Sequence, residues 1–157
     1  RHRRRHQGRP LPEGNLAMAA NEPDEDGQRG VVVNTASIAG LRGNPPNMAT
    51  IAYNTSKGAD VNFVRALAAE WGKYNITVNT ICPNHVTTGL GAWQNQFFSA
   101  ATGRSEQQYL ADMRARIPLG RPGLQEDIAK ACAFLASAEA SYITGEAMNV
   151  SGGEEYH

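Results

Sequence analysis

The tyrosine and lysine of the segment YNTSK are the residue pair in this sequence best suited to acid–base chemistry. Tyr53 and Lys57 stand at positions i and i+4, which places both side chains on one face of a helix. A free phenol titrates at about pH 10 and exchanges protons poorly at neutral pH. A neighbouring ammonium favours the phenolate, so the pair can serve as a general acid and base. The same spacing occurs by chance in many helices, so its weight depends on the surrounding residues.

Polar groups also follow the ends of two apolar segments that flank this pair. Ser37 comes directly after VVVNTA at 31–36, and the segment 83–88 follows ITVNTIC at 76–82. Ligands of parallel sheets bind beyond the carboxyl ends of the strands. We therefore expect the Ser37 hydroxyl and the 83–88 segment to face one crevice with Tyr53, where the hydroxyl can bond a substrate oxygen.

The elements that must position these residues alternate between strand and helix. The sequence predicts strands at 31–36, 76–82 and 147–150 and helices at 53–74, 105–117 and 125–137. Segments 37–50 and 84–104 are expected to be irregular, because glycine, proline and asparagine recur in 37–50 and no clear period runs through 84–104. Strands that alternate with helices indicate an α/β fold with a parallel sheet and right-handed crossovers.

The composition is that of an ordinary globular domain. The 157 residues suffice for one domain, and 15 basic residues balance 15 acidic ones, which gives no argument for nucleic acid or membrane as partner. Cys82 and Cys132 form no metal-ligand spacing, so we expect no metal and a reducing compartment, the cytoplasm. No apolar run approaches the ~18 residues of a membrane span, and no signal-peptide pattern is present.

The first 29 residues differ from the rest of the chain. Residues 1–10 are basic, residues 21–30 are acidic and turn-rich, and LAMAA at 16–20 reads as the last turn of a helix. We interpret 1–29 as an irregular N-terminal segment and 30–157 as the folded domain. The basic run has no interleaved aromatic residue, so we favour a solvated tail over nucleic-acid binding.

Four segments resemble the short-chain dehydrogenase/reductase family in order and near its spacing: VVNTASIAG, AYNTSKGA, ITVNTICP and ITGEAMNVSGG. The resemblance runs from about Gly30 to Gly153. It implies a partial doubly wound, Rossmann-type parallel sheet, made of the last three strands of that fold with their flanking helices. It implies that Tyr53 is the acid–base residue, that Ser37 orients the substrate oxygen, and that Lys57 binds the nicotinamide ribose and favours the phenolate.

The same resemblance implies a cofactor, a substrate class and an assembly. The cofactor is NAD or NADP, and the residues implied to bind it are Thr35, Tyr53, Lys57, Pro83, Val86 and Thr88. The substrate is a small alcohol or ketone, either a polyol, a sugar acid or a hydroxyacyl compound. The long helix and the last strand form the family's subunit interfaces, so we expect a dimer or tetramer.

The chain departs from the family pattern at the site itself. Asn84 follows Pro83 where the family has glycine; asparagine tolerates the left-handed conformation that a glycine turn can require. Ser151 stands where the family commonly has aspartate. We interpret His85, in the same loop as Asn84, as an exposed or packing residue. The stretch 89–104 is expected to act as a substrate lid, with its aromatic residues lining an apolar pocket or packing in the core: Trp93, Phe97 and Phe98.

The largest departure is the missing strand and glycine-rich turn that seat the cofactor's pyrophosphate on a helix N-terminus. No such pattern precedes Gly30, and the family's catalytic asparagine has no counterpart. The first strand is then expected to expose an unpaired edge. We therefore expect a truncated NAD(P)-dependent oxidoreductase with weak or absent activity as an isolated chain. The alternative is a catalytically silent homologue that acts through subunit association.

Overall fold

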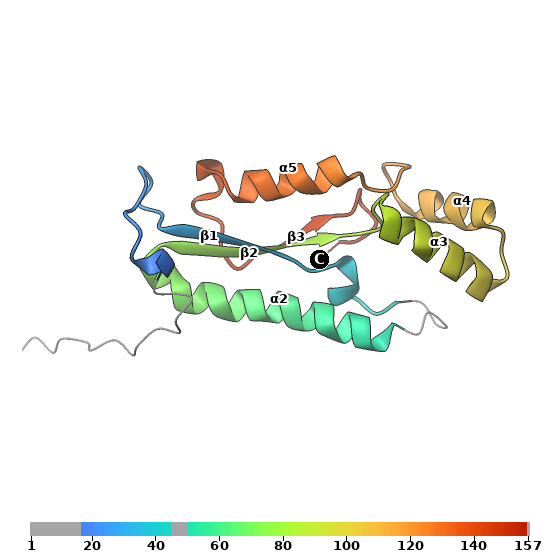
Figure 1. Cartoon of the computed structure of the whole chain (residues 1–157), viewed down its shortest axis with the longest axis horizontal. Helices are drawn as coiled ribbons and strands as arrows, with labels where there is room; N and C mark the ends of the chain where they lie inside the picture. Colours follow the sequence, from blue (N-terminus) through green and yellow to red (C-terminus); the bar gives the residue numbers. More distant parts are fainter. Residues whose placement is uncertain (1–16, 45–49, 157) are drawn as a thin grey trace, which may run out of the picture.

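A three-stranded parallel sheet forms the centre of the molecule (Figure 1). A computed structural model describes residues 17–44 and 50–156 of the chain. The strands are β1 (Gly30–Thr35), β2 (Ile76–Pro83) and β3 (Ala147–Val150), and they lie side by side in the order β1-β2-β3. Gly30 pairs with Ile76 and Thr80 with Ala147, both in parallel register. The predicted sheet of three adjacent strands is confirmed.

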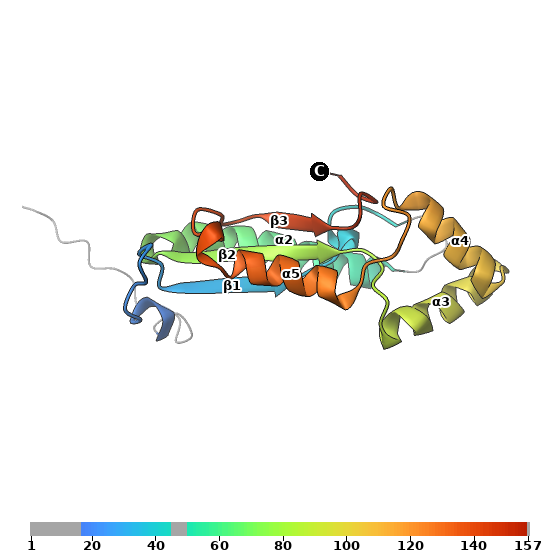
Figure 2. The same cartoon turned by 90° about the horizontal axis from the view of Figure 1, so that it is seen from above.

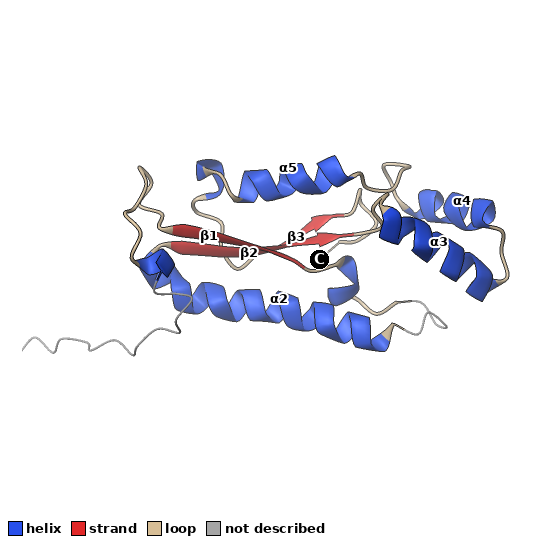
Figure 3. Cartoon of the chain, viewed as in Figure 1, coloured by secondary structure: helices blue, strands red, loops and turns tan. Residues whose placement is uncertain are grey.

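Helices cover both faces of this sheet, as Figures 1 and 3 show. Helix α2 (Ile51–Trp71) lies along one face, and α5 (Gln125–Leu135) lies along the other. Helices α3 (Gly89–Thr102) and α4 (Glu106–Arg116) form a hairpin beyond the carboxyl ends of the strands (Figure 2). Short 3-10 turns are η1 (Ile38–Gly40), η2 (Gly72–Tyr74) and η3 (Ala138–Ala140).

The core lies on the two faces of β2, in which every residue except Pro83 is buried. Ile76 and Val78 pack against Val64 and Ala68 of α2, while Ile81 contacts the opposite cluster around Leu135 of α5. Successive side chains of a strand point to opposite faces, so a strand covered on both sides reads as a continuous apolar run. This burial explains why residues 76–82 were recognisable as a strand.

Two helix ends follow directly from local sequence. Asn75 ends the α2–η2 segment in the left-handed conformation, with φ of 56°, which asparagine adopts more readily than most residues. Ser105 begins α4 with a capping box: its hydroxyl accepts from the Gln108 amide, and the Gln108 side chain accepts from the Ser105 amide. Residues 17–19 are helical, as the LAMAA segment predicts.

The prediction that residues 84–104 are irregular is wrong, because α3 occupies 89–102. The Thr88 hydroxyl caps the helix by accepting from the Gly91 amide, and Gly103 ends it with φ of 67°. Gly89 and Gly91 therefore lie in the first turn of α3 and Gly103 just after its end, positions where glycine destabilises a helix little. The helix lies beyond the strand ends and packs against α4 rather than against the sheet (Figure 2).

The sheet has two edge strands among those described, β1 and β3. β1 pairs with β2 alone, so its outer backbone groups face no other described strand, as expected. The basic run at 1–10 and part of the 37–50 loop lie outside the described residues. Within the described part of the chain, no helix is both long enough and apolar enough to cross a membrane.

Candidate active site

A cavity of about 490 Å³ lies where the three strands end. Segments that follow all three strands line it, and α2 and the α3–α4 hairpin supply the remaining walls. Its volume falls in the range of small-molecule sites, roughly 300–1,000 Å³. Its position matches the rule that ligands of parallel sheets bind beyond the strand carboxyl ends.

Most of the predicted site residues meet at this cavity. The cavity-lining residues among them are Ser37, Tyr53, Pro83, Val86 and Thr88. Ser37 begins η1, and its Oγ accepts from the Ala39 amide at 3.1 Å, which leaves the hydroxyl hydrogen to donate elsewhere. Tyr53 lies in the first turn of α2 and is 46% exposed.

Lys57 and Thr35 lie beside this group rather than on the cavity wall. The Lys57 ammonium donates to the Thr35 carbonyl at 3.0 Å and forms an ion pair with Asp60 at 3.1 Å. Thr35 is the last residue of β1, so Lys57 fastens α2 to the strand end that leads into Ser37. The lysine stays one helical turn after Tyr53, on the same face.

The 83–88 segment is held in place from outside the sheet. Val86 forms a parallel bridge with Gly123, the Thr87 amide donates to the Gly123 carbonyl, and the Gly123 amide donates to the His85 carbonyl. A Cβ atom at Gly91 would lie 2.3 Å from the Val86 carbonyl oxygen, so only glycine fits there. This packing fixes the main chain around Val86 against the start of α3.

Burial perturbs three titratable groups at or near the cavity, and it raises the pKa of the Tyr109 phenol on the wall. His85 lines the cavity half-buried, and burial lowers the pKa of its imidazole, although the Glu154 carboxylate partly opposes this. Burial raises the pKa of the Cys82 thiol, although the Ser37 backbone and the Arg65 and Lys57 charges oppose the change. Burial therefore favours the thiol form of Cys82 in the core and the neutral imidazole of His85 on the wall.

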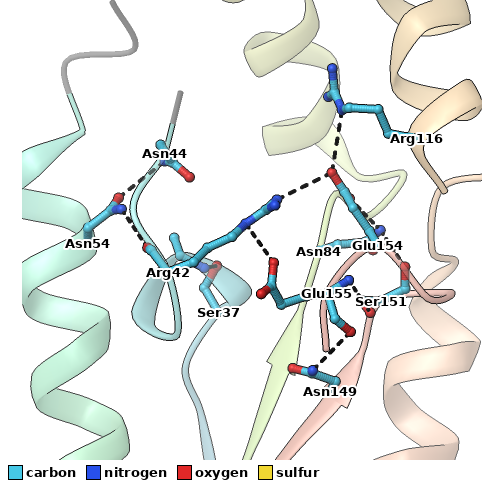
Figure 4. Close-up of polar contacts among 11 residues, drawn as sticks. Ser37, Arg42, Asn44, Asn54, Asn84, Arg116, Asn149, Ser151, Glu154 and Glu155 are labelled. Carbon is cyan, nitrogen blue, oxygen red and sulfur yellow. Dashed lines mark hydrogen bonds and ion pairs between the residues drawn. The ribbon is translucent and has the colours of Figure 1, made fainter. Parts of the chain in front are cut away.

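A group of polar residues on the cavity wall was not among the predicted site residues (Figure 4). Glu154, on the turn after β3, contacts Arg42, Arg116 and Asn84. The first and last of these partners lie 112 and 70 residues away in the chain. No local motif signals contacts of this range. Asn84 itself was noted as a departure, but it does not adopt positive φ, and its amide bonds the C-terminal turn instead.

The aromatic residues of α3 divide between wall and surface. Phe98 lines the cavity together with Tyr109 of α4, whereas Trp93 and Phe97 stack on each other at 5.2 Å and are 57% and 49% exposed. The expected apolar lining therefore comes from Phe98 alone of the three. Neither of the other two packs in the core.

The chain is similar to curated proteins over most of its length. The family described as Enoyl-(Acyl carrier protein) reductase matches residues 15–155. A relative named 2-(S)-hydroxypropyl-CoM dehydrogenase 3, from Xanthobacter autotrophicus, is 43% identical over 126 residues, 80% of this chain and 46% of the relative. Another from that organism, named inactive 2-(S)-hydroxypropyl-CoM dehydrogenase 2, is 41% identical over 128 residues, 80% of this chain and 51% of the relative. The chain spans about half the length of these relatives.

Solved structures give the same coverage. The structure titled NAD+-bound xylitol dehydrogenase has a TM-score of 0.71 and 34% identity, covering 78% of this chain and 48% of that one. The actinorhodin polyketide ketoreductase with NADPH has a TM-score of 0.75 and 31% identity, covering 81% and 48%. The described fold therefore corresponds to about half of a larger Rossmann-type domain in each.

Proposed function

The chain belongs to the short-chain dehydrogenase/reductase family, and we propose that it carries the substrate-binding and nicotinamide-binding half of an NAD(P)-dependent oxidoreductase. The observation that carries this proposal is the meeting of Ser37, Tyr53 and the 83–88 segment around one cavity at the strand ends. These groups come from three separate elements, so their meeting depends on the fold and not on sequence proximity. The reaction is the interconversion of a secondary alcohol and a ketone.

In this reaction the chain's residues hold the substrate oxygen and move its proton. The Ser37 hydroxyl donates a hydrogen bond to that oxygen, and the Tyr53 phenol gives it a proton during reduction or takes one during oxidation. Lys57 places a fixed positive charge one helical turn from Tyr53, anchored by the Thr35 carbonyl. That charge stabilises the negative charge that develops on the phenol oxygen as its proton leaves.

The cavity wall fits the nicotinamide end of the cofactor. Pro83, Val86 and Thr88 offer a flat apolar contact, a fixed main chain and a hydroxyl beside Ser37 and Tyr53. When bound, the nicotinamide supplies or accepts the hydride. Thr35 and Lys57, next to this wall, would hold its ribose. The sequence offers no glycine-rich turn before Gly30 for the pyrophosphate, so we expect this chain to bind the whole dinucleotide weakly.

A catalytically silent role is the second candidate. One relative of 41% identity is itself named inactive. In this chain the Lys57 ammonium is also shared with the Asp60 carboxylate, which offsets part of its charge. Under this alternative the chain acts by associating with other subunits, and its cavity has no substrate to convert.

Fluorescence titration of the reduced cofactor against the purified chain separates the two candidates. The oxidoreductase proposal expects weak but saturable enhancement of nicotinamide fluorescence, lost in Lys57→Ala and retained in Tyr53→Phe, because the lysine holds the ribose and the phenol serves proton transfer. Any alcohol oxidation by the chain should disappear in Tyr53→Phe. The absence of saturable binding, together with a dimer in sedimentation, would instead support the silent role.

A further inference from the structure

A carboxylate from the C-terminal turn is buried in the wall of the cavity. The Glu154 side chain is 9% exposed, and it lines the cavity together with Ser37 and Tyr53. Acidic side chains are seldom buried to this extent unless partners hold them. The residues that hold Glu154 therefore indicate what this part of the cavity is built to do.

Asn84 and two arginines fix the position of Glu154 (Figure 4). The Asn84 amide donates to Glu154 Oε2 at 3.0 Å and to the Ser151 carbonyl at 2.9 Å, which fastens the C-terminal turn to the end of β2. Arg42 Nη2 and Arg116 Nε approach Glu154 Oε1 at 3.5 and 3.7 Å. The carboxylate is thus held from the loop after η1, from α4 and from the β2 end at once.

These contacts leave hydrogen-bond acceptors unused. A carboxylate has about four acceptor positions, yet only the Asn84 contact has the length of a good N–H···O bond, and both arginine contacts are at or beyond its limit. Buried acceptors of this kind normally have a donor.

We propose that Glu154, positioned by Asn84, binds a substrate hydroxyl that lies away from the reacting carbon, so that the preferred substrate is a polyhydroxylated alcohol or ketone. The inference rests on the proposed function, because it assigns the substrate of the same cavity. A hydroxyl supplies a donor to the Glu154 carboxylate, whereas a hydrocarbon chain would leave its remaining acceptors without one. A substrate anion is disfavoured because the charges of Arg42 and Arg116 are already balanced by Glu154 and Glu155.

The test compares two alcohols that differ by one hydroxyl: 2-pentanol and 1,4-pentanediol. Both carry the same secondary alcohol, and the diol adds a hydroxyl at the far end. Dissociation constants for the intact chain are measured by saturation-transfer NMR. We expect the diol to bind at least about tenfold more tightly, the lower end of the gain from one hydrogen bond to a charged group.

Two variants locate the origin of this preference. In Glu154→Gln and in Asn84→Ala the preference for the diol over 2-pentanol should fall to about twofold or less. Glu155→Gln is the matched control, because Glu155 pairs with Arg42 at 2.9 Å but does not line the cavity; its preference should equal that of the wild type. If Glu154→Gln fails to fold by circular dichroism, Asn84→Ala provides the same comparison.

Several results would overturn the inference: equal affinities of the wild type for both alcohols, binding of neither, or a diol preference that survives in both variants. The cofactor titration described above decides the proposed function separately. Saturable nicotinamide binding without a diol preference would leave the oxidoreductase proposal intact and refute the role of Glu154. A diol preference without nicotinamide binding would support the role of Glu154 and refute the oxidoreductase proposal.

Discussion

His85 connects the protonation of the cavity wall to the stability of the fold. Burial lowers the pKa of its imidazole in the folded chain, while the unfolded chain keeps an ordinary value of about 6.5. Below that value the unfolded state takes up a proton before the folded state does. The free energy of unfolding should therefore fall as the pH drops from about 6.5 through the lower pKa of the folded state. Above about pH 6.5, His85 is neutral in both states and should cost the fold no stability.

Urea unfolding at several pH values between 5 and 7.5 measures this effect. The wild type should lose more stability over this range than His85→Gln, in which the remaining three histidines are unchanged. Removing the Glu154 charge should lower the His85 pKa further, because that carboxylate favours the imidazolium. Parallel pH profiles for wild type and His85→Gln would contradict the assignment.

The site residues that could be predicted are those fixed by local pattern. Ser37 follows a recognisable strand, and Tyr53 and Lys57 share a helix, so strand ends and helical spacing were sufficient to place them. Glu154 and Arg42 could not be predicted in the same way. Their contact depends on the path of the whole chain, and neither residue has a neighbour in sequence that indicates a partner. The chemical roles of all these residues stay predictions.

At the scale of elements, the capping box of α4 is the clearest device that the sequence encodes. The Ser105 hydroxyl accepts from the Gln108 amide at 3.2 Å, and Gln108 Oε1 accepts from the Ser105 amide at 3.1 Å. Replacing Ser105 by alanine should destabilise the chain by about 1 kcal/mol, the usual cost of losing an N-cap. Gln108→Glu keeps an acceptor at that position and should change stability little.

Chemical denaturation followed by helical circular dichroism checks both variants, and equal stability of Ser105→Ala and wild type would show that α4 does not depend on its cap.

The strands and α4 were predicted because caps, prolines and apolar runs mark their ends. Helix α3 was not, because its stability comes from the Thr88 cap and from contacts with α4 that no period of the sequence reveals. Trp93 and Phe97 are apolar but exposed, so the apolar residues of α3 do not mark its buried face.

At the scale of the molecule, the bare edge of β1 invites association. Unpaired strand edges pair readily with other chains, and lysine on an edge strand opposes this. We expect wild-type chain to associate with increasing concentration in sedimentation velocity, and Val31→Lys to reduce that association. Val31 belongs to no buried cluster among the described residues, so the lysine should cost little packing.

Gln107→Lys is the matched control, since it adds the same charge on an exposed position of α4, away from the edge. It should associate like the wild type. Association that persists unchanged in Val31→Lys would show that the contact lies on another surface of the chain. Substitution of Phe63, which is 59% exposed on α2, would then test whether that helix forms the contact.

Substitutions before and after the carboxyl ends of the strands should have different consequences. Inside β2 the side chains carry the core, so nearly every exchange there would be selected against. Just past the strands, Ser37, Asn84 and Glu154 line the cavity and belong to none of the buried clusters among the described residues. Substitutions at a few loop positions can therefore reshape the cavity wall without disturbing the buried strand beneath it.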